Sequence, residues 1–327
     1  MQVDIRKYFT PAAVAMHLEA LPELKTPIID LIYTNRPTHP LPVLGIDELA
    51  GVVSNVPVVR RGTAAYPLTG EGKKITYLEP QPVDVSSFLS AVDLNNLKLL
   101  DNRGVGQWAQ NKVDTQRRAV RATTEAMACQ SLTGKISYPM KTDSGLTTYD
   151  VDFGATLSYT IAKKWDAADA DIITILGDLI AMQTLMQGKS GYGSRLVVLA
   201  GKKAFLAVAR LALAIVADRN MGVTVSEGSI VLPGFTIVLA SGGYVDLINN
   251  NAWVPAVADT HVAMVALDAP FRLFYCALDD LDANLLPMPF YSKPIKVDNP
   301  SGYNIIGMSK PVPVPVVNAI CRGVATT

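Results

Sequence analysis

Cysteine, histidine and charged residues are all scarce in this chain of 327 residues. It contains three cysteines and three histidines, and charged residues make up only 18% of it. The cysteines are far apart and show no CxxC spacing, which argues against a zinc site or a disulfide framework. They are typical of small buried hydrophobic side chains in a reducing compartment. The cysteines are Cys129, Cys276 and Cys321.

Charge of neither sign dominates, because Lys+Arg and Asp+Glu both number 29. The chain therefore lacks the global positive field that would hold nucleic acid. Mean hydropathy is +0.24, yet no run approaches the roughly 20 apolar residues of a membrane span. The first residues lack the apolar core of a signal peptide, so we expect a protein that works in the cytosol where it is made. A chain so apolar is expected to hide further surface in an obligate oligomer.

Motifs of nucleotide binding, metal binding and nucleophilic catalysis are missing as well. The GKS triplet at residues 188–190 has Gln183 where a phosphate-binding loop has glycine, and it follows a helical pattern rather than a strand. The acidic run at 279–282 lacks the glycine and closing glutamate of a calcium loop, which favours a solvated turn. No HExxH or GxSxG motif occurs. We expect no catalytic residue, no cofactor and no metal ion.

The stretch from Gly106 to Thr133 predicts one long helix. It contains no proline and is rich in strong helix formers. Its apolar stripe is thin, which suits a flat domain where the helix backs a single sheet, although a solvated surface helix is the simpler interpretation. Asp114–Arg118 and Arg121–Glu125 are spaced to pair along one side. The stripe consists of Val105, Ala109, Val113, Val120 and Met127, with Trp108 beside them.

Residues 1–50 read as an N-terminal arm, rich in proline and with one short helix from Pro11 capped by Thr10. We expect this arm to lie on something else, such as a neighbouring subunit. In residues 51–90, two extended runs flank a turn at 70–74 and predict a long hairpin. Because the hairpin has too few apolar residues for its own core, either it is floppy or a partner surface holds it.

The remaining elements predict an α+β chain with two domains. The long helix and two strands joined by a turn at 141–145 form the first domain, residues 91–169. Helices and strands alternate through the second domain, residues 170–285, whose first helix is capped by Asp169 or Asp171. Residues 286–327 return as strands, and their prolines suit a sheet edge or an extended crossing.

Several stretches of the chain are similar to stretches of one protein family, and their order and spacing together carry the resemblance. They are VVRRGTAAYPLTGEGKKITYLEPQPVDVSS, the arginine-rich helix ending at SLTGKI, TYDVDFG, LVVLAGKKAF and YSKPIKVDNPSGYNIIGMSKPVPVPV. The chain resembles the major capsid proteins of tailed phages, and more specifically the lambda-like major head protein family. The resemblance covers most of the chain, and none of its motifs is catalytic.

The resemblance implies a Hong Kong 97-like capsid fold with a long spine helix at about residues 106–133, a peripheral domain and an axial domain near the capsomer centre. The extended loop would lie over the peripheral domain of the next subunit. Copies would form pentamers and hexamers of an icosahedral shell around phage double-stranded DNA, held without sequence-specific binding and without a membrane.

The resemblance also implies partners and a location. We expect a virion protein assembled in the host cytoplasm with a portal, with a separate scaffolding protein because the N-terminal segment is short, and with a possible decoration protein. An encapsulin-like compartment shares the fold and stays open as an alternative. A soluble two-domain enzyme of unrecognised type is the remaining alternative.

Ten charged residues are the candidates for inter-subunit contacts. On the extended loop they are Arg60, Arg61, Glu71, Lys73, Lys74 and Glu79. On the long helix, which we expect to receive the loop, they are Arg117, Arg118, Arg121 and Glu125.

Overall fold

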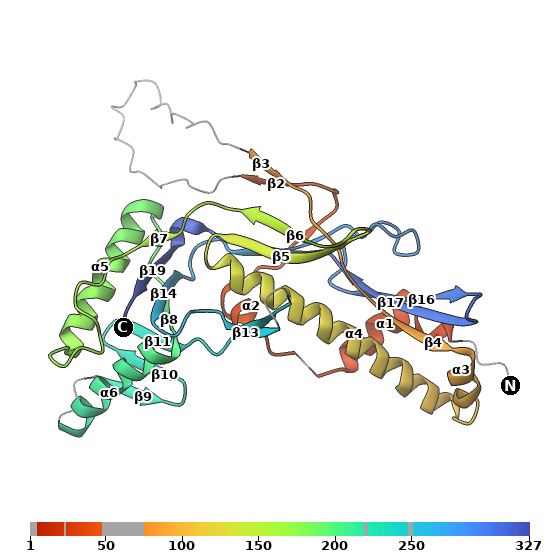
Figure 1. Cartoon of the computed structure of the whole chain (residues 1–327), viewed down its shortest axis with the longest axis horizontal. Coiled ribbons are helices and arrows are strands. Elements are labelled where there is room, and N and C mark those ends of the chain that lie inside the picture. The colour runs from red at the N-terminus through yellow and green to blue at the C-terminus, as the bar shows by residue number, and fades with distance from the viewer. Residues whose placement is uncertain (1–4, 23, 48–74, 219–221, 248–250) are drawn as a thin grey trace, which may run out of the picture. The chain divides into compact units, whose positions relative to one another are not determined.

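The computed structural model describes residues 5–22, 24–47, 75–218, 222–247 and 251–327. The chain divides into two units (Figure 1). Unit 1 comprises residues 1–44, 79–127 and 272–313, and unit 2 comprises residues 45–78, 128–271 and 314–327. A helix or strand that crosses the division is assigned to the unit that holds most of its residues.

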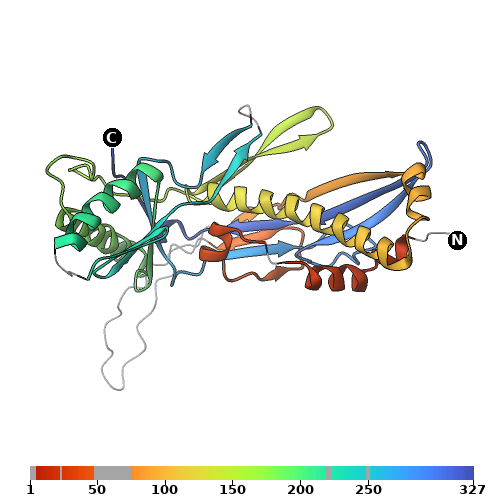
Figure 2. The ribbon, with the colours of Figure 1, turned by 90° about the horizontal axis from the view of Figure 1, so that it is seen from below.

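Unit 1 is built on the long helix. Its elements are η1 (Arg6–Tyr8), α1 (Pro11–Ala20), α2 (Pro27–Ile32), β1 (Thr38–His39), β4 (Val83–Ser90), α3 (Ala91–Leu97), α4 (Asn102–Ser131), β15 (Arg272–Cys276), β16 (Tyr291–Val297), β17 (Gly302–Ser309) and β18 (Pro311–Val314). Helix α4 lies along an antiparallel sheet in the order β16–β17–β4, as Figure 2 shows. The predicted apolar stripe of α4 is buried, and Ala109, Val113 and Val120 pack with Ile305 of β17. A long helix backing a single sheet is therefore confirmed.

The N-terminal segment packs on α4 of its own chain. Phe9 and Val14 join the same core as Ala109 and Val113 of α4. As predicted, Thr10 caps α1, because its Oγ1 accepts a hydrogen bond from the amide of Ala13 at 3.2 Å. The apolar residues of this segment complete the core of unit 1.

Helix α4 begins earlier and is more buried than its composition predicts. It starts at Asn102, where the Asp101 carboxylate accepts a hydrogen bond from the amide of Gly104 at 2.7 Å. Residues 124–129 are all buried, so the interpretation as a solvated surface helix is wrong for this part of α4. This part of α4 is buried on every side, so the thin apolar stripe in the sequence underestimates how much of the helix packs against other elements.

Unit 2 contains a larger mixed sheet and two long helices. Its elements are β2 (Leu44–Asp47), β3 (Ile75–Leu78), β5 (Lys135–Thr142), β6 (Gly145–Asp152), β7 (Leu157–Ser158), α5 (Ile172–Ser190), β8 (Leu196–Ala200), α6 (Lys202–Asp218), β9 (Thr224–Ser226), β10 (Ser229–Leu232), β11 (Phe235–Leu239), β12 (Gly243–Asp246), β13 (Ala252–Pro255), β14 (His261–Ala266), η2 (Val317–Ala319) and β19 (Ile320–Val324). The seven-stranded sheet has the order β7–β19–β14–β8–β11–β10–β9. Helix α5 packs beside β19, and α6 packs beside β9, β10 and β11.

The α5 helix follows its sequence signals closely. Asp171 caps it by accepting from the amide of Thr174 at 2.7 Å, and Gly191 ends it in a left-handed conformation with φ of 73°. Its buried residues include Ile175, Leu179 and Met182, which follow one another at helical spacing. The helix that carries the GKS triplet is thus a core helix.

The element boundaries also differ from the sequence prediction in the extended loop and at the domain boundary. Residues 83–90 form β4, which pairs with β17, so they do not belong to a two-stranded hairpin. Strands β2 and β3 form a two-stranded sheet, and residues 48–74 between them lie outside the described residues. Unit 2 already contains residues 128–169, with β7 paired to β19, whereas the sequence predicts the domain boundary at 169–170.

Two further expectations are confirmed. Proline-rich β18 lies at the edge of the sheet β1–β15–β18. The cysteines are free and buried, and burial raises the pKa of the Cys276 and Cys321 thiols to about 11. Within the described ranges, no helix has both the length and the apolar character needed to cross a membrane.

Candidate functional site

One charged face of α4 receives Pro22 and residues 26–30 of the same chain. Arg117, Arg121 and Glu125 follow one another at four-residue spacing, which places them on one side of the helix. The Arg117 guanidinium donates to the carbonyl of Pro22 at 2.8 Å. Arg121 donates to Thr26 Oγ1 at 2.6 Å. These bonds attach the segment before α2 to α4.

Glu125 caps the start of helix α2. Its Oε1 accepts from the amide of Ile28 at 2.8 Å, and its Oε2 accepts from the amide of Ile29 at 3.0 Å. The first amides of a helix have no partner within the helix, so the carboxylate satisfies two of them. Glu125 is only 5% exposed, and burial raises the pKa of its carboxyl although both amides lower it. This side chain serves the fold of its own chain.

Asp30 of α2 completes the attachment. Its Oδ1 accepts from Arg121 and from Arg36, both at 2.7 Å, and its Oδ2 accepts from the amide of Thr26 at 2.7 Å. Burial raises the pKa of the Asp30 carboxyl, but the bonds from Thr26 and Arg36 and the charge of Arg121 outweigh it, so the pKa is lowered. The pairing of Arg121 with Asp30 replaces the predicted Arg121–Glu125 pair, whereas the predicted Asp114–Arg118 pair is confirmed at 2.7 Å.

Replacing Asp30 with asparagine should make stability less dependent on acid pH. Because the folded-state pKa lies below the ordinary value of 3.8, the ionised carboxylate stabilises the fold at neutral pH. The wild type loses this contribution as the pH falls through the lowered pKa. We expect Asp30→Asn to be less stable at neutral pH and to approach the wild type once the pH falls below the lowered pKa, measured by denaturant unfolding. Asp143→Asn, in an exposed turn, is the control; a difference independent of pH would contradict the assignment.

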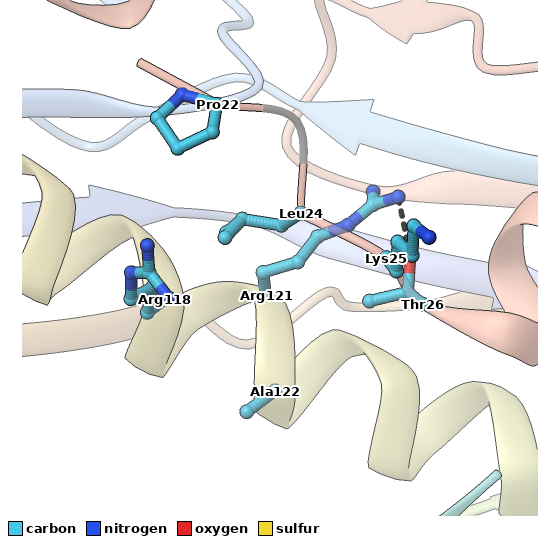
Figure 3. A pocket seen from close by; sticks show the side chains of 7 residues that line it. All are labelled: Pro22, Leu24, Lys25, Thr26, Arg118, Arg121 and Ala122. Atoms are coloured by element: carbon cyan, nitrogen blue, oxygen red, sulfur yellow. Dashed lines mark hydrogen bonds between the residues drawn. The ribbon is translucent and has the colours of Figure 1, made fainter.

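A basic pocket of about 340 Å³ opens beside this attachment, lined by Pro22, Leu24, Lys25, Thr26, Arg118, Arg121 and Ala122 (Figure 3). Figure 3 shows the Arg121 guanidinium reaching across to Thr26, with Lys25 next to it. The Arg118 side chain is 55% exposed. The lining contains three cations and no acid. Arg121 is already paired with Asp30, and Arg118 with Asp114. Lys25 and the exposed side of Arg118 are therefore the charges that the pocket offers to a carboxylate.

The comparison with protein families decides what this architecture belongs to. The model of the family described as phage major capsid protein E matches residues 10–325. The chain belongs to this family.

Solved structures share the fold of this capsid protein. A chain assigned as the capsid protein of a prophage in Escherichia coli CFT073 has a TM-score of 0.65 at 15% identity, covering 97% of this chain and 99% of that one. A phage-related protein from Bordetella bronchiseptica RB50 has a TM-score of 0.54 at 11% identity, covering 96% and 97% respectively. No curated protein sequence matches. Family and fold together identify a structural protein of a phage shell that associates with copies of itself.

The predicted contact residues of the capsid protein fall into three groups. Those between residues 60 and 74 lie outside the described part of the chain. Glu79 is exposed just after β3. On α4, the side chains of Arg117, Arg121 and Glu125 bond within the chain, and Arg118 is the most exposed of the four. The group outside the described residues is Arg60, Arg61, Glu71, Lys73 and Lys74.

Sequence analysis missed Lys25, Thr26 and Asp30, which complete the attachment and the pocket. A local signal was present, because Thr26 precedes Pro27 as a capping residue precedes a proline at the first helical position. This signal predicts where α2 begins, but it does not predict that the start of α2 binds to α4.

The acidic run at 279–282 is held by ion pairs and is more than a solvated turn. Lys293 lies 2.6 Å from both Asp280 and Asp282, and Lys310 lies 2.7 Å from Asp279. Desolvation by burial opposes charge on Asp280, but the bonds from Lys293 and neighbouring amides outweigh it and lower its pKa. These lysines come from β16 and the residue after β17, so tertiary structure supplies the counter-charges.

Proposed function

We propose that this capsid protein assembles into pentamers and hexamers of an icosahedral shell that encloses phage double-stranded DNA. The family match over residues 10–325 carries the proposal. Equal numbers of acidic and basic residues agree with it, because DNA confined by a closed wall needs no tight or sequence-specific site. The fold is that of the Hong Kong 97-like capsid proteins, with unit 1 as the peripheral domain and unit 2 as the axial domain.

Assembly in this proposal takes place in the host cytoplasm with a separate scaffolding protein and a portal, and a decoration protein can bind the finished shell. In the proposed shell, the extended loop predicted from the sequence, most of which lies outside the described residues, contacts unit 1 of the next subunit. Arg118, whose side chain is 55% exposed, and the exposed Lys25 of the basic pocket support this arrangement, because the N-terminal segment engages Arg121 but leaves these two cations accessible. Each contact can be weak, since many of them act together in a shell.

Electron microscopy of the purified protein, alone and co-expressed with its neighbouring genes, tests the proposal. Closed shells or sheets of hexamers are the expected result, and DNA inside particles made during infection distinguishes a virus shell from an encapsulin-like compartment. A stable monomer or dimer under every condition would overturn the proposal.

Reversing the charge of Arg118 should impair assembly without unfolding the subunit. We expect Arg118→Glu to require an about tenfold higher protein concentration for shell formation, which corresponds to one lost contact of moderate strength. Its free energy of unfolding should change by less than about 1 kcal/mol, because the Asp114–Arg118 pair lies at the surface. Light scattering and microscopy measure assembly. Arg118→Lys keeps the charge and serves as the control, and normal assembly of Arg118→Glu would remove this residue from the interface.

A further inference from the structure

The hairpin of β12 and β13 in unit 2 carries an exposed apolar face. The strands pair antiparallel, with Val245 directly opposite Trp253. Trp253 is 62% exposed, Val245 is 43% exposed, and Leu247, which follows β12, is 53% exposed. Side chains opposite one another in a strand pair share a face, so Val245 and Trp253 form one continuous apolar surface.

The Trp253 ring packs against Gly243, where the lack of a side chain leaves room for it. A Cβ on Gly243 would lie 2.7 Å from Cζ2 and 2.9 Å from Cε2 of the Trp253 indole. The ring therefore covers the backbone of Gly243, on the same face as Val245. An aromatic side chain that already packs on the backbone has less rotamer freedom to lose when a partner binds. Tryptophan is also enriched among the residues that dominate binding energy.

The hairpin has the properties of a surface that a partner covers. The strands β12 and β13 form a two-stranded sheet of their own, and an isolated two-stranded hairpin is only marginally stable. Its exposed face is apolar and aromatic without a charge, which is typical of the centre of an interface rather than its rim.

The family assignment indicates that the partner is another copy of the same chain. The chain belongs to a family of shell proteins, so each molecule is surrounded by others like it. We propose that the face formed by Gly243, Val245 and Trp253 docks against a second copy of this chain, with Trp253 as its anchor. This inference rests on the proposed shell function and adds a contact surface to it.

Tryptophan fluorescence tests the contact directly, because Trp253 differs from the other two tryptophans. Trp165 is fully buried and Trp108 packs in the core of unit 1. Acrylamide quenching is measured on dissociated wild-type subunits and on shells, and subtraction of the Trp253→Phe signal isolates Trp253. We expect Trp253 to be quenched in dissociated subunits and protected in shells.

Matched variants test whether the contact drives assembly. Trp253→Ala and Val245→Lys should need at least about tenfold more protein to form shells, as expected when an interface anchor is lost. Trp253→Phe should assemble close to the wild-type concentration, because it keeps an aromatic ring. Ala252→Lys, on the opposite face of β13, is the matched control for Val245→Lys and should assemble normally. Circular dichroism and denaturant unfolding confirm that each subunit is folded.

The outcomes separate this inference from the proposed function. Wild-type shells in which Trp253 is still quenched, or normal shells from Trp253→Ala, would overturn the inference alone. Protection that appears only after a decoration protein is added would assign the face to that protein and overturn the docking of a second copy. Failure of the wild type to form shells under any condition would overturn the proposed function and this inference with it.

Discussion

Replacing Glu125 with alanine should lower the free energy of unfolding by about 2–4 kcal/mol. The carboxylate accepts hydrogen bonds from the amides of Ile28 and Ile29, and alanine leaves both buried amides without an acceptor. Each unpaired buried donor costs about 1–3 kcal/mol, and the loss is partly offset because the variant no longer buries a charge. We therefore expect helix α2 to loosen from α4.

Denaturant unfolding measures the total effect, and hydrogen exchange locates it. The amides of Ile28 and Ile29 should exchange faster in Glu125→Ala than in the wild type, because their acceptors are gone. Glu125→Gln keeps one acceptor oxygen and should fall between the two. Arg118→Ala, on the exposed side of α4, should change stability by less than about 1 kcal/mol. Unchanged exchange at both amides would show that the carboxylate does not cap α2.

Replacing Gln116 with leucine should lower the free energy of unfolding by about 2–4 kcal/mol, because it removes the hydrogen bonds that join α4 to the sheet of β16 and β17. Gln116 Nε2 donates to the carbonyl of Ile305 at 2.7 Å, and its Oε1 accepts from Ser292 Oγ at 2.9 Å. Pro294 lies opposite Ile305 in the neighbouring strand and has no N–H to offer that carbonyl. Leucine fills a similar volume but leaves the carbonyl and the hydroxyl without these partners.

A double-mutant cycle isolates this network. Ser292→Ala alone should destabilise less than Gln116→Leu, because it removes a hydroxyl and leaves the bond to Ile305 intact. In the Gln116→Leu background, the same change should cost little, since the hydroxyl has already lost its acceptor. We expect a coupling of about 1 kcal/mol between the two positions. Additive effects would show that the side chains act independently.

Local composition predicts the helices well where the signals lie within a few residues. Asp171 and Gly191 mark both ends of α5, because capping involves only neighbouring backbone groups. The predicted start of α4 is too late, since Gly104 weakens the helical pattern. The Asp101 side chain caps the helix there, and burial stabilises it.

The charged site shows where prediction from spacing stops. Asp114 and Arg118 pair as predicted, because both lie on one helix and no other group competes for them more strongly. Arg121 and Glu125 have the same spacing but bond to Asp30 and to the amides of α2. A buried helix start offers stronger partners than a solvated neighbour does, and helical spacing gives no information about it.

The sequence by itself determined the family, the α+β class, the long helix and the absence of recognisable catalytic motifs, because order, composition and short-range spacing carry these properties. Only the tertiary structure decided that the N-terminal segment lies on α4, that β4 pairs with β17, and that the acidic run at 279–282 pairs with Lys293 and Lys310. The physical reason is the same in each case. The groups that satisfy buried amides, open strand edges and charges come from distant parts of the chain, and only folding brings them together.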